Sequence, residues 1–452
     1  MLSISGMRGL VGRSLTPPVA ARFGAAYGHW LHANRRPGHD PKTAPHAVLG
    51  RDSRQSGQMF EAAVAAGLIA TGCRVTQVGI LSTPGVAVMA DHLQADGGMV
   101  ITASHNPFPW NGIKSLRYDG VAPPADEANE IIRRFNEDDV DYAQVGDLQT
   151  IGDDASGVEV HVRRVLELVD IGLIRSASLS AVVDSVHGAG GAEAWALLDA
   201  LGVKIHHLYA EPTGDFPHVP EPTKENLTEL SSVVAQQGAD IGFAQDPDAD
   251  RLAVVDENGT YIGEEYTLAL CALHKLGQGE GVAANLSTSR MVDDIAQGVG
   301  GTVIRTPVGE AHVTSGMRAH GCTLGGEGNG GIIDNRVSQV RDSLIGMAYL
   351  CELIAQRKAP LSAAVREFPS YAIVKDKADI DPAILATMPQ KMREAFGDQH
   401  IDTQDGIRVD WDDKWVHVRS SNTEPIIRVI AEARDQDLAQ ELVSQVRSVL
   451  GL

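Results

Sequence analysis

Several apolar runs in this chain read as buried strands that end directly in a polar or glycine-rich loop. Three of them are GGMVITASHN from Gly97, GADIGFAQ from Gly238 and GCTLGGEGNGG from Gly321. Helix-like stretches, such as the alanine-rich segment Gln58–Thr71, alternate with these runs. Alternating strands and helices predict an α/β fold with largely parallel sheets. Because ligands bind outside the carboxyl ends of the strands in such sheets, the loops after the runs are the first candidates for a functional site.

The length of the chain and its changing pattern predict several domains. At roughly 100–200 residues per domain, 452 residues correspond to about three or four. Three mixed α/β units share the succession of strand and functional loop. From about Pro369 a smaller α+β unit follows, in which VHVRSSNTEPIIRVIAEA reads as strand, loop and strand. We place the domains at residues 1–150, 151–255, 256–368 and 369–452.

The composition excludes several classes of partner. With a formal net charge of -21, the chain shows no basic face of the kind that nucleic-acid binding needs. The four cysteines are far apart and form no CxxC pair, which argues against a disulfide framework or a zinc site and favours a reducing compartment. No signal-peptide pattern opens the chain and no apolar run approaches about 18 residues, so we expect no membrane span and a cytoplasmic protein. An anionic substrate would then need a local cluster of arginines.

The loop DPDADR carries three carboxylates at alternate positions, Asp246, Asp248 and Asp250, followed by Arg251. In an extended or looped backbone these side chains point toward one side, and clustered oxygen ligands suit Mg²⁺ or Ca²⁺. A solvated acidic turn is the alternative, but three like charges repel one another unless a cation neutralises them. An EF-hand fails, because Arg251 occupies the position where its turn needs glycine and the flanking segments read as strands. The loop therefore predicts a magnesium site between two strands.

The loop RSSNTEPIIR, from Arg419 to Arg428, offers groups that bind phosphate. Its two arginines can donate bidentate hydrogen bonds to a phosphate group. Ser421, Asn422 and Thr423 add further hydrogen-bonding groups. A polar hairpin turn is the alternative interpretation.

The glycine-rich stretch GGEGNGG, from Gly325 to Gly331, is not a nucleotide-binding loop. No Gly-Lys-Ser/Thr follows it, and GxGxxG does not occur in the required strand-turn-helix context. Its glycines let a ligand approach closely, and Glu327 and Asn329 can bond to hydroxyl or amine groups. Taken alone, the stretch is more typical of a flexible surface turn.

Ser104 lies in TASHNP, at the end of one of the strand-like runs. Its neighbour His105 is poorly placed as the base of a hydrolase triad, and the chain contains no GxSxG elbow. One interpretation is a turn hydroxyl that caps a backbone amide. The other is a serine that carries a phosphoryl group beside a metal, since phosphoryl transfer depends mainly on positioning and charge neutralisation.

Taken together and in this order, four stretches resemble the α-D-phosphohexomutase superfamily, which comprises phosphoglucomutases, phosphomannomutases and phosphoglucosamine mutases. The stretches are TASHNP with NGIK, DPDADR, GGEGNGG and RSSNTEPIIR, and the match begins at SGMRG (Ser5–Gly9). The resemblance spans nearly the whole chain. It implies four domains around a deep central cleft, three of them similar mixed α/β units, with one loop contributed by each domain.

The resemblance also implies a role for individual residues. Ser104 is similar to the phosphoserine of the superfamily, whose phosphate would ligate Mg²⁺ together with the three aspartates. Arg8 and Arg251 would neutralise charge around that phosphate. Lys114 and His105 match residues proposed for acid/base work and phosphate stabilisation. Substrate contacts are implied for the sugar loop, Glu327 and Asn329, and for the loop that binds the non-reacting phosphate, Arg419, Ser421, Asn422, Thr423 and Arg428.

The sugar loop departs from the pattern of many members. Where they read GExSGH, this chain reads GEGNGG, with Asn329 in place of serine and Gly331 in place of histidine. The opening SISGMRG also lacks the frequent Phe-Gly-Thr. SGMRG with GEGNGG is most similar to bacterial and archaeal members grouped with phosphoglucosamine mutases.

The implied function is a phosphohexomutase that interconverts hexose 6-phosphate and hexose 1-phosphate. Phospho-Ser104 would donate its phosphoryl group, giving a hexose 1,6-bisphosphate that serves as intermediate and activator. Glucosamine 6-phosphate is the expected substrate, with phosphomannomutase or phosphoglucomutase activity as alternatives. Other classes are a metal-dependent sugar phosphatase or kinase, of which the kinase is disfavoured by the missing nucleotide signature, and a non-enzymatic sugar-phosphate-binding protein. The expected partner is a small sugar phosphate, not a nucleic acid or a membrane, and the sequence predicts no particular oligomeric state.

Overall fold

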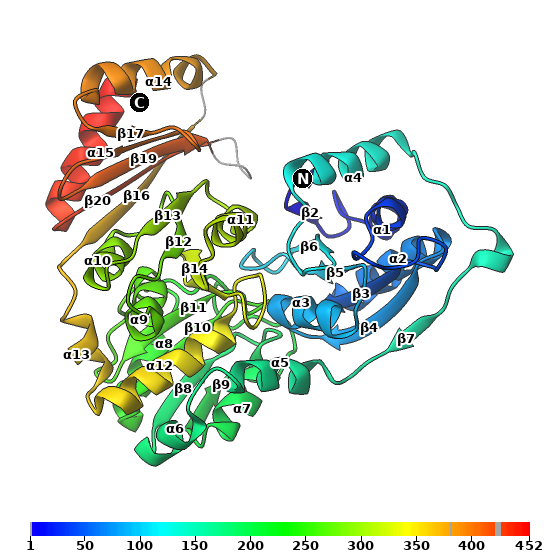
Figure 1. The fold of residues 1–452 in the computed structure, drawn as a ribbon, viewed down its shortest axis with the longest axis horizontal. Helices are drawn as coiled ribbons and strands as arrows, with labels where there is room; N and C mark the ends of the chain where they lie inside the picture. Colours follow the sequence, from blue (N-terminus) through cyan, green and yellow to red (C-terminus); the bar gives the residue numbers. More distant parts are fainter. Residues whose placement is uncertain (1, 380–381, 421–425) are drawn as a thin grey trace. The chain divides into compact units, whose positions relative to one another are not determined.

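The computed structural model (Figure 1) describes residues 2–379, 382–420 and 426–452. These residues form two compact units. The first unit comprises the described residues up to Lys275 together with Asn329–Ala363. The second comprises Leu276–Gly328 and the described residues from Ala364 onward. Among the described residues, no helix is both long enough and apolar enough to cross a membrane.

The first unit begins with a seven-stranded mixed sheet in the order β1-β2-β6-β5-β3-β4-β7. Strands β5, β3, β4 and β7 run parallel, whereas β6 and β2 run antiparallel to their neighbours. The strands are β1 (Leu2–Ser3), β2 (Gly6–Leu10), β3 (His46–Arg51), β4 (Arg74–Ile80), β5 (Gly97–Ile101), β6 (Trp110–Arg117) and β7 (Ile151–Asp153). The carboxyl end of β5 leads directly into the loop that contains Ser104.

Helices α1 and α2 pack against each other and, with strand side chains such as Leu49 and Met99, form the apolar core of this part of the unit. Helix α3 packs against β3 and β5, and α4 against α1. The bounds are α1 (Pro17–Ala33), α2 (Gly57–Ala70), α3 (Thr83–His92) and α4 (Ala125–Glu137), followed by a short 3-10 helix, η1 (Val145–Asp147).

The second sheet of the first unit has the order β11-β10-β8-β9. Strands β9, β8 and β10 are parallel and β11 returns antiparallel to β10, so the DPDADR segment forms the turn of a hairpin. Both segments that flank the aspartates are therefore strands, as predicted, which excludes the EF-hand. The strands are β8 (Ser180–Asp184), β9 (Lys204–Leu208), β10 (Ile241–Gln245) and β11 (Leu252–Asp256).

Helix α12 is buried along nearly its whole length and packs against α5, α6, α7 and α9. Helix α8 covers β8, β10 and β11 through Leu230 and Val234. The remaining elements of the first unit are α5 (Gly157–Leu166), α6 (Ile171–Ala177), α7 (Gly191–Ala200), α8 (Thr228–Gln237), α9 (Glu265–Lys275), β15 (Gly331–Asp334) and α12 (Ser343–Arg357).

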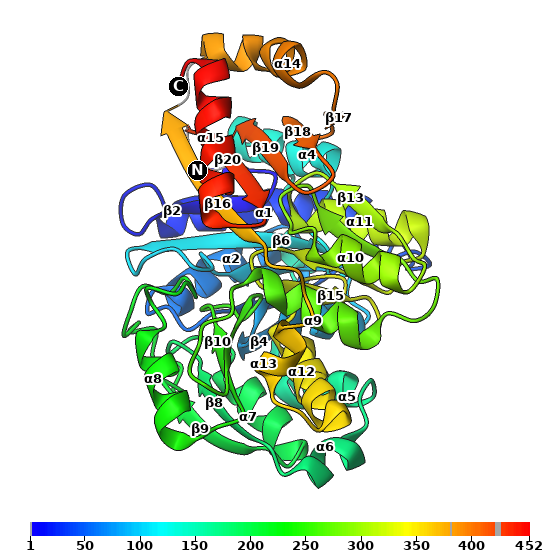
Figure 2. The ribbon, with the colours of Figure 1, turned by 90° about the vertical axis from the view of Figure 1, so that its left-hand side faces the viewer.

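In the second unit, β13, β12 and β14 lie side by side in this order and run parallel, with α11 packed on all three. A five-stranded antiparallel sheet follows, in the order β16-β20-β19-β18-β17. Helix α15 packs along β16 and β20 (Figure 2). The elements are β12 (Val282–Asn285), α10 (Met291–Gly298), β13 (Val303–Thr306), α11 (Glu310–His320), β14 (Leu324–Glu327), β16 (Ala372–Asp379), α14 (Pro382–Phe396), β17 (His400–Asp402), β18 (Ile407–Asp410), β19 (Trp415–Ser420), β20 (Ile426–Ala433) and α15 (Gln436–Leu450), while α13 spans Leu361–Val365.

The predicted fold class is confirmed: mixed α/β units are followed by an α+β unit at the C-terminal end. The sheets are less purely parallel than the sequence pattern suggests, because β2, β6 and β11 are antiparallel. Strand β7 pairs with β4, so the first sheet extends just past residue 150. The four domain ranges themselves stay a prediction.

Gly67 sets the close approach of α1 and α2. A Cβ atom at this position would lie 2.1 Å from the carbonyl oxygen of Ala21 and 2.7 Å from the backbone nitrogen of Ala25. We expect Gly67→Ala to lower the free energy of unfolding by about 1–3 kcal/mol, since the backbones of the two helices must move apart. Gly298→Ala in α10 is the control, because a Cβ atom there meets nothing within 4 Å, and it should change stability by no more than about 1 kcal/mol, in the stabilising direction. Urea denaturation measures both, and a Gly67→Ala protein as stable as the original would contradict the prediction.

Candidate active site

Ser104 lies in the loop directly after β5 and is 2% exposed. Its φ of 49° lies in the left-handed region, which a non-glycine residue adopts only when its surroundings hold it there. The Ser104 backbone N–H donates to Thr102 Oγ1 at 2.8 Å, and the Ser104 hydroxyl donates to Asp246 Oδ2 at 2.8 Å. Nδ1 of His105 lies 3.3 Å from the same hydroxyl. The predicted phosphoserine therefore lies against the predicted metal loop.

Arg54 holds the serine loop from inside the protein and is only 1% exposed. Its Nε–H donates to Asp52 Oδ2 at 3.1 Å, and the same carboxylate oxygen accepts from the Thr102 hydroxyl at 2.7 Å. The rest of the guanidinium donates to backbone carbonyl oxygens of the loop at 2.6–3.2 Å, namely those of Ser104, Asn106, Pro107 and Trp110. Because charge-assisted hydrogen bonds in a buried site are strong, Arg54 stabilises the unusual backbone around Ser104.

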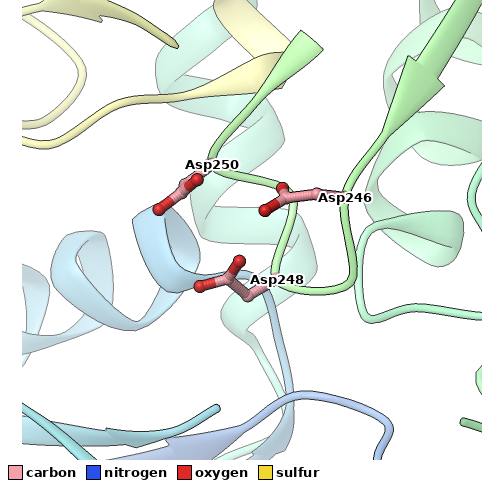
Figure 3. Close-up of side chains that lie close together, drawn as sticks. All are labelled: Asp246, Asp248 and Asp250. Carbon is pink, nitrogen blue, oxygen red and sulfur yellow. The ribbon is translucent and has the colours of Figure 1, made fainter. Parts of the chain in front are cut away.

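Asp246, Asp248 and Asp250 point toward one another in the turn between β10 and β11 (Figure 3). One carboxylate oxygen of each lies within 4.8 Å of the others, and all three residues are at most 1% exposed. This is the arrangement that the alternating spacing predicts. The three residues are called the aspartate trio below.

Several side chains donate hydrogen bonds to the aspartate trio. Lys114 Nζ donates to Asp248 Oδ2 at 2.7 Å and to Asp250 Oδ2 at 3.1 Å. The Thr83 hydroxyl donates to Asp248 Oδ2 at 2.6 Å, and Arg341 Nη2 donates to Asp250 Oδ2 at 2.7 Å. All these contacts use Oδ2 of Asp248 and of Asp250.

Oδ1 of Asp248 and Oδ1 of Asp250 are buried and have no hydrogen-bond partner among the described residues. Leaving a buried carboxylate oxygen unpaired costs free energy. Mg²⁺ takes oxygen ligands and often binds through carboxylates. The donor set and the two unpaired oxygens therefore fit a divalent cation.

The three carboxyl groups differ in their acidity. Burial, together with the charges of Asp248 and Asp250, raises the pKa of Asp246 well above its usual range. Burial also opposes ionisation of Asp248 and Asp250, but nearby cations outweigh this effect, so the pKa of each lies below its usual value. The cation is Lys114 at Asp248, and Arg341 together with Lys114 at Asp250. Asp246, beside Ser104, is therefore the least acidic carboxyl group of the trio.

The predicted phosphate-neutralising arginines lie beside the serine and the trio. Arg8 Nη1 donates to Asn106 Oδ1 at 3.1 Å. The Arg251 backbone N–H donates to Asp246 Oδ1 at 3.2 Å, while its Nε–H is buried without a partner among the described residues. Burial, followed by the charges of Arg251 and Arg8, lowers the pKa of His105 to about 2, so its imidazole is neutral. The first unit thus brings Ser104, His105, Lys114, Arg8, Arg251 and the trio together, and their catalytic roles stay predictions.

Glu327 lies in the second unit, at the end of β14, and is buried. Its Oε1 accepts from Asn285 Nδ2 at 2.8 Å and from the Gly309 backbone N–H at 3.1 Å. These two donors fix the orientation of the carboxylate.

Arg419 and Arg428 lie directly opposite each other on β19 and β20 of the second unit. Arg419 Nε donates to Asp405 Oδ2 at 2.9 Å, but its Nη2 is buried without a partner among the described residues. Two like charges on opposed strand positions destabilise a sheet unless an anion lies between them. Ser421, Asn422 and Thr423, predicted for the same loop, lie outside the described residues.

The two unusual residues of the sugar loop belong to the first unit. Asn329 Oδ1 accepts from the Gly331 backbone N–H at 3.2 Å. A Cβ atom at Gly331 would lie 2.1 Å from Arg341 Cδ and 2.8 Å from its Cγ. Arg341 therefore occupies the space that a side chain at position 331 would need, and from there it reaches Asp250. Because position 331 is glycine and not histidine, the side chain of Arg341 has room to contact Asp250.

Sequence reasoning did not identify Arg54, Thr83 or Arg341 as functional residues. Arg54 and Thr83 follow the carboxyl ends of β3 and β4, the same positional signal that identified Ser104 after β5. Arg341 has no such signal, since it precedes a helix in a segment without a recognisable motif.

Comparisons with known proteins agree with this geometry. Residues 3–141, 159–259, 263–371 and 371–449 match, in this order, alpha/beta/alpha domains I, II and III and the C-terminal domain of Phosphoglucomutase/phosphomannomutase. A "Probable phosphoglucosamine mutase" of Methanopyrus kandleri is 36% identical over 446 residues, covering 97% of this chain and 95% of the relative. A "Phosphoglucomutase/phosphomannomutase" of Thermococcus kodakarensis is 37% identical over 445 residues, covering 96% and 95%. The crystal structure of a phosphoglucomutase/phosphomannomutase family protein from Burkholderia thailandensis superimposes with a TM-score of 0.86 at 27% identity, covering 100% of this chain and 98% of that one.

The chain therefore belongs to the phosphoglucomutase/phosphomannomutase family of the α-D-phosphohexomutase superfamily. It is an enzyme of the phosphohexomutase class, an isomerase that acts by phosphoryl transfer.

A divalent cation should stabilise the folded protein through the aspartate trio. At a Mg²⁺ concentration of 100 times Kd, we expect the free energy of unfolding to rise by about 2.7 kcal/mol, because the cation binds only the folded state. Asp248→Asn should lose most of this gain, since it removes one ligand charge. Asp256→Asn is the matched control: Asp256 lies at the other end of β11, where its Oδ1 accepts from the backbone N–H groups of Asn258 and Thr260, and asparagine keeps that acceptor. Thermal melts with and without Mg²⁺ measure the effect, and an undiminished gain in Asp248→Asn would show that the trio is not the site.

Proposed function

We propose that the protein interconverts the 6-phosphate and the 1-phosphate of glucosamine, with Ser104 carrying the transferred phosphoryl group. The observation that carries this proposal is the Ser104 hydroxyl, which donates a 2.8 Å hydrogen bond into a buried group of three carboxylates. A serine hydroxyl at a trio of oxygen ligands is the arrangement that phosphoryl transfer needs, because the reaction depends on positioning and on neutralising charge.

Each residue near Ser104 has a task in this proposal. Asp246, Asp248 and Asp250, with an oxygen of the phosphoserine, would hold Mg²⁺, which when bound stabilises the charge on the transferred group. The guanidinium groups of Arg8 and Arg251 donate hydrogen bonds to phosphoryl oxygens. Lys114 and His105 remain the candidates for moving the proton of the sugar hydroxyl, as the superfamily resemblance implies.

A second group of residues binds the phosphate that is not being transferred. We assign this task to Arg419 and Arg428, because the buried Nη2 of Arg419 has no described partner and Arg428 lies directly opposite Arg419 in the sheet. Ser421, Asn422 and Thr423 complete this loop in the proposal. The hexose 1,6-bisphosphate intermediate carries a phosphate at each end, so the same residues bind either end as the reaction proceeds.

The proposed sugar is glucosamine. Similar proteins that cover nearly the whole chain carry the name "Probable phosphoglucosamine mutase", but a relative of equal similarity is named "Phosphoglucomutase/phosphomannomutase". The buried carboxylate of Glu327, oriented by two donors, is a suitable acceptor for amine and hydroxyl groups of a sugar. Glucose and mannose phosphates are the alternative substrates.

The cysteines favour a reducing compartment, and we propose the cytoplasm. All four are free and buried. Burial raises the pKa of the Cys73 and Cys351 thiols to about 12, so both stay protonated and unreactive at neutral pH.

Ser104→Ala tests the proposed phosphoryl carrier. We expect mutase turnover to fall by several orders of magnitude, because no other described hydroxyl donates to the trio from the serine loop, and intact-mass measurement should find a phosphoryl group on the original protein but not on the variant. Ser115→Ala is the control, since the buried Ser115 hydroxyl has no described partner and its loss should leave turnover unchanged.

Measurements on the same proteins also distinguish the other two classes, a sugar phosphatase and a sugar-phosphate-binding protein. A sugar phosphatase would release inorganic phosphate from the bisphosphate, and a sugar-phosphate-binding protein would show no phosphoryl group on Ser104. Full turnover by Ser104→Ala would refute the proposed mechanism.

Sugar preference is tested with glucosamine 6-phosphate, glucose 1-phosphate and mannose 1-phosphate side by side, each with Mg²⁺ and the corresponding bisphosphate. We expect kcat/KM for glucosamine 6-phosphate to exceed the others by about tenfold or more, the discrimination that one substituent in a pocket provides. A higher value for either of the other sugars would transfer the proposal to that substrate and leave the phosphoserine mechanism intact.

A further inference from the structure

His161, in α5, is fully buried between two acidic side chains of the first unit. Its Nδ1 lies 2.7 Å from Glu193 Oε1, and its Nε2 lies 2.8 Å from Asp342 Oδ2. A neutral imidazole has only one N–H donor, so two carboxylate contacts of this length require the imidazolium form. In agreement, the two carboxylates outweigh the effect of burial and raise the pKa of His161 to about 10.

Both carboxylates also bind the first residues of helices. Glu193, in the first turn of α7, accepts from the Ser82 backbone N–H at 3.0 Å and from the Ser82 hydroxyl at 2.9 Å. Ser82 caps the start of α3. Asp342 caps the start of α12, where it accepts from the Leu344 backbone N–H at 2.8 Å. The imidazolium of His161 thus connects the starts of α3, α7 and α12.

The starts of these three helices also bind the backbone of the aspartate loop. The Thr83 N–H, at the start of α3, donates to the carbonyl oxygen of Asp248 at 2.9 Å. The N–H groups of Ala189, just before α7, and Ser343, the first residue of α12, donate to the neighbouring carbonyl oxygens, those of Pro247 at 2.8 Å and Ala249 at 3.3 Å.

The side chains at the same helix starts bind the trio itself. The Thr83 hydroxyl donates to Asp248, and Arg341, the residue before Asp342, donates to Asp250. Ala249 lies between these two aspartates with a φ of 53°, a conformation that its own sequence does not favour. The helix starts therefore impose the shape of the loop.

We propose that His161 is a positioning residue for the metal site: its bridge from Glu193 to Asp342 fixes the starts of α3, α7 and α12, and through them the aspartate trio. His161 contacts neither the trio nor Ser104, so it takes no part in the chemistry. The inference rests on the proposed function in one respect only, namely that the trio binds a divalent cation.

The test is the affinity of the full-length protein for Mn²⁺, measured by electron paramagnetic resonance titration. In His161→Gln the amide can donate to only one of the two carboxylates and carries no charge. We expect Kd for Mn²⁺ to rise about tenfold or more, the usual effect of losing a residue that orients metal ligands. Turnover should fall at low Mg²⁺ and recover as Mg²⁺ is raised, while KM for the sugar phosphate stays unchanged.

Two further variants keep the test decisive. Asp342→Asn retains a helix-capping side chain but removes one charge from the bridge, so it should weaken Mn²⁺ binding in the same direction, and it takes over the test if His161→Gln does not fold. His274→Gln is the matched control. His274 is another histidine of the first unit that contacts a carboxylate, with a side chain only 6% exposed and Nε2 2.7 Å from Glu352 Oε2. This variant should lower stability without changing Kd for Mn²⁺.

An unchanged Kd for Mn²⁺ in folded His161→Gln, or in folded Asp342→Asn where His161→Gln does not fold, would overturn the inference. An equal rise of Kd for Mn²⁺ in His274→Gln would also overturn the inference, because the weaker binding would then reflect a general loosening of the fold. A wild-type protein that binds no Mn²⁺ would instead contradict the proposed function itself, so the two failures are distinguishable.

Discussion

Mutual repulsion within the aspartate trio is the constraint on which the rest of the site depends. At about 4 Å and an effective dielectric constant near 20, two like charges repel each other by about 4 kcal/mol, and the carboxylate oxygens of the trio lie within 4.8 Å of one another. Cationic side chains and the N-termini of helices offset this repulsion. Lys114 and Arg341 donate to carboxylate oxygens of Asp248 and Asp250. Helices α3 and α12 begin at the loop, where the positive ends of their dipoles favour nearby negative charge.

The charges around Ser104 also suit a phosphoryl group that would be transferred to and from the serine. Arg8, Lys114, Arg251 and Arg341 are the cationic side chains whose charges act on the trio. A phosphoserine carries close to two negative charges at neutral pH, and a divalent cation carries two positive ones. A cation and a phosphoryl group bound together would therefore add little net charge to this site. In a chain with a formal net charge of -21, such a local concentration of arginine and lysine is a specific feature and not a consequence of composition.

The parts of this site that are local in sequence were predictable, and the parts that depend on distant contacts were not. The trio could be recognised because alternate residues of one turn between two strands point to one side, and Ser104 because it follows a buried strand. The contacts of Thr83 with Asp248 and of Arg341 with Asp250 join residues 165 and 91 positions apart. No spacing rule connects such residues. His161 was equally hidden, because a lone histidine in an amphipathic helix has no local signal that distinguishes a buried charge bridge from an ordinary core position.

Backbone strain explains why so many buried donors surround the two loops. Ser104 and Ala249 both adopt left-handed φ values, in the serine loop and the aspartate loop respectively. Glycine would relieve the strain at either position, but it would remove the hydroxyl at 104 and would give both loops more freedom in the unfolded chain. The protein instead keeps a side chain at each position and binds the flanking carbonyl oxygens with Arg54 on one side and with the starts of three helices on the other. Because these donors are groups of the protein itself, the fold sets the geometry of the serine and of the trio. Such preorganisation is the condition under which fixed dipoles and charges contribute most to catalysis.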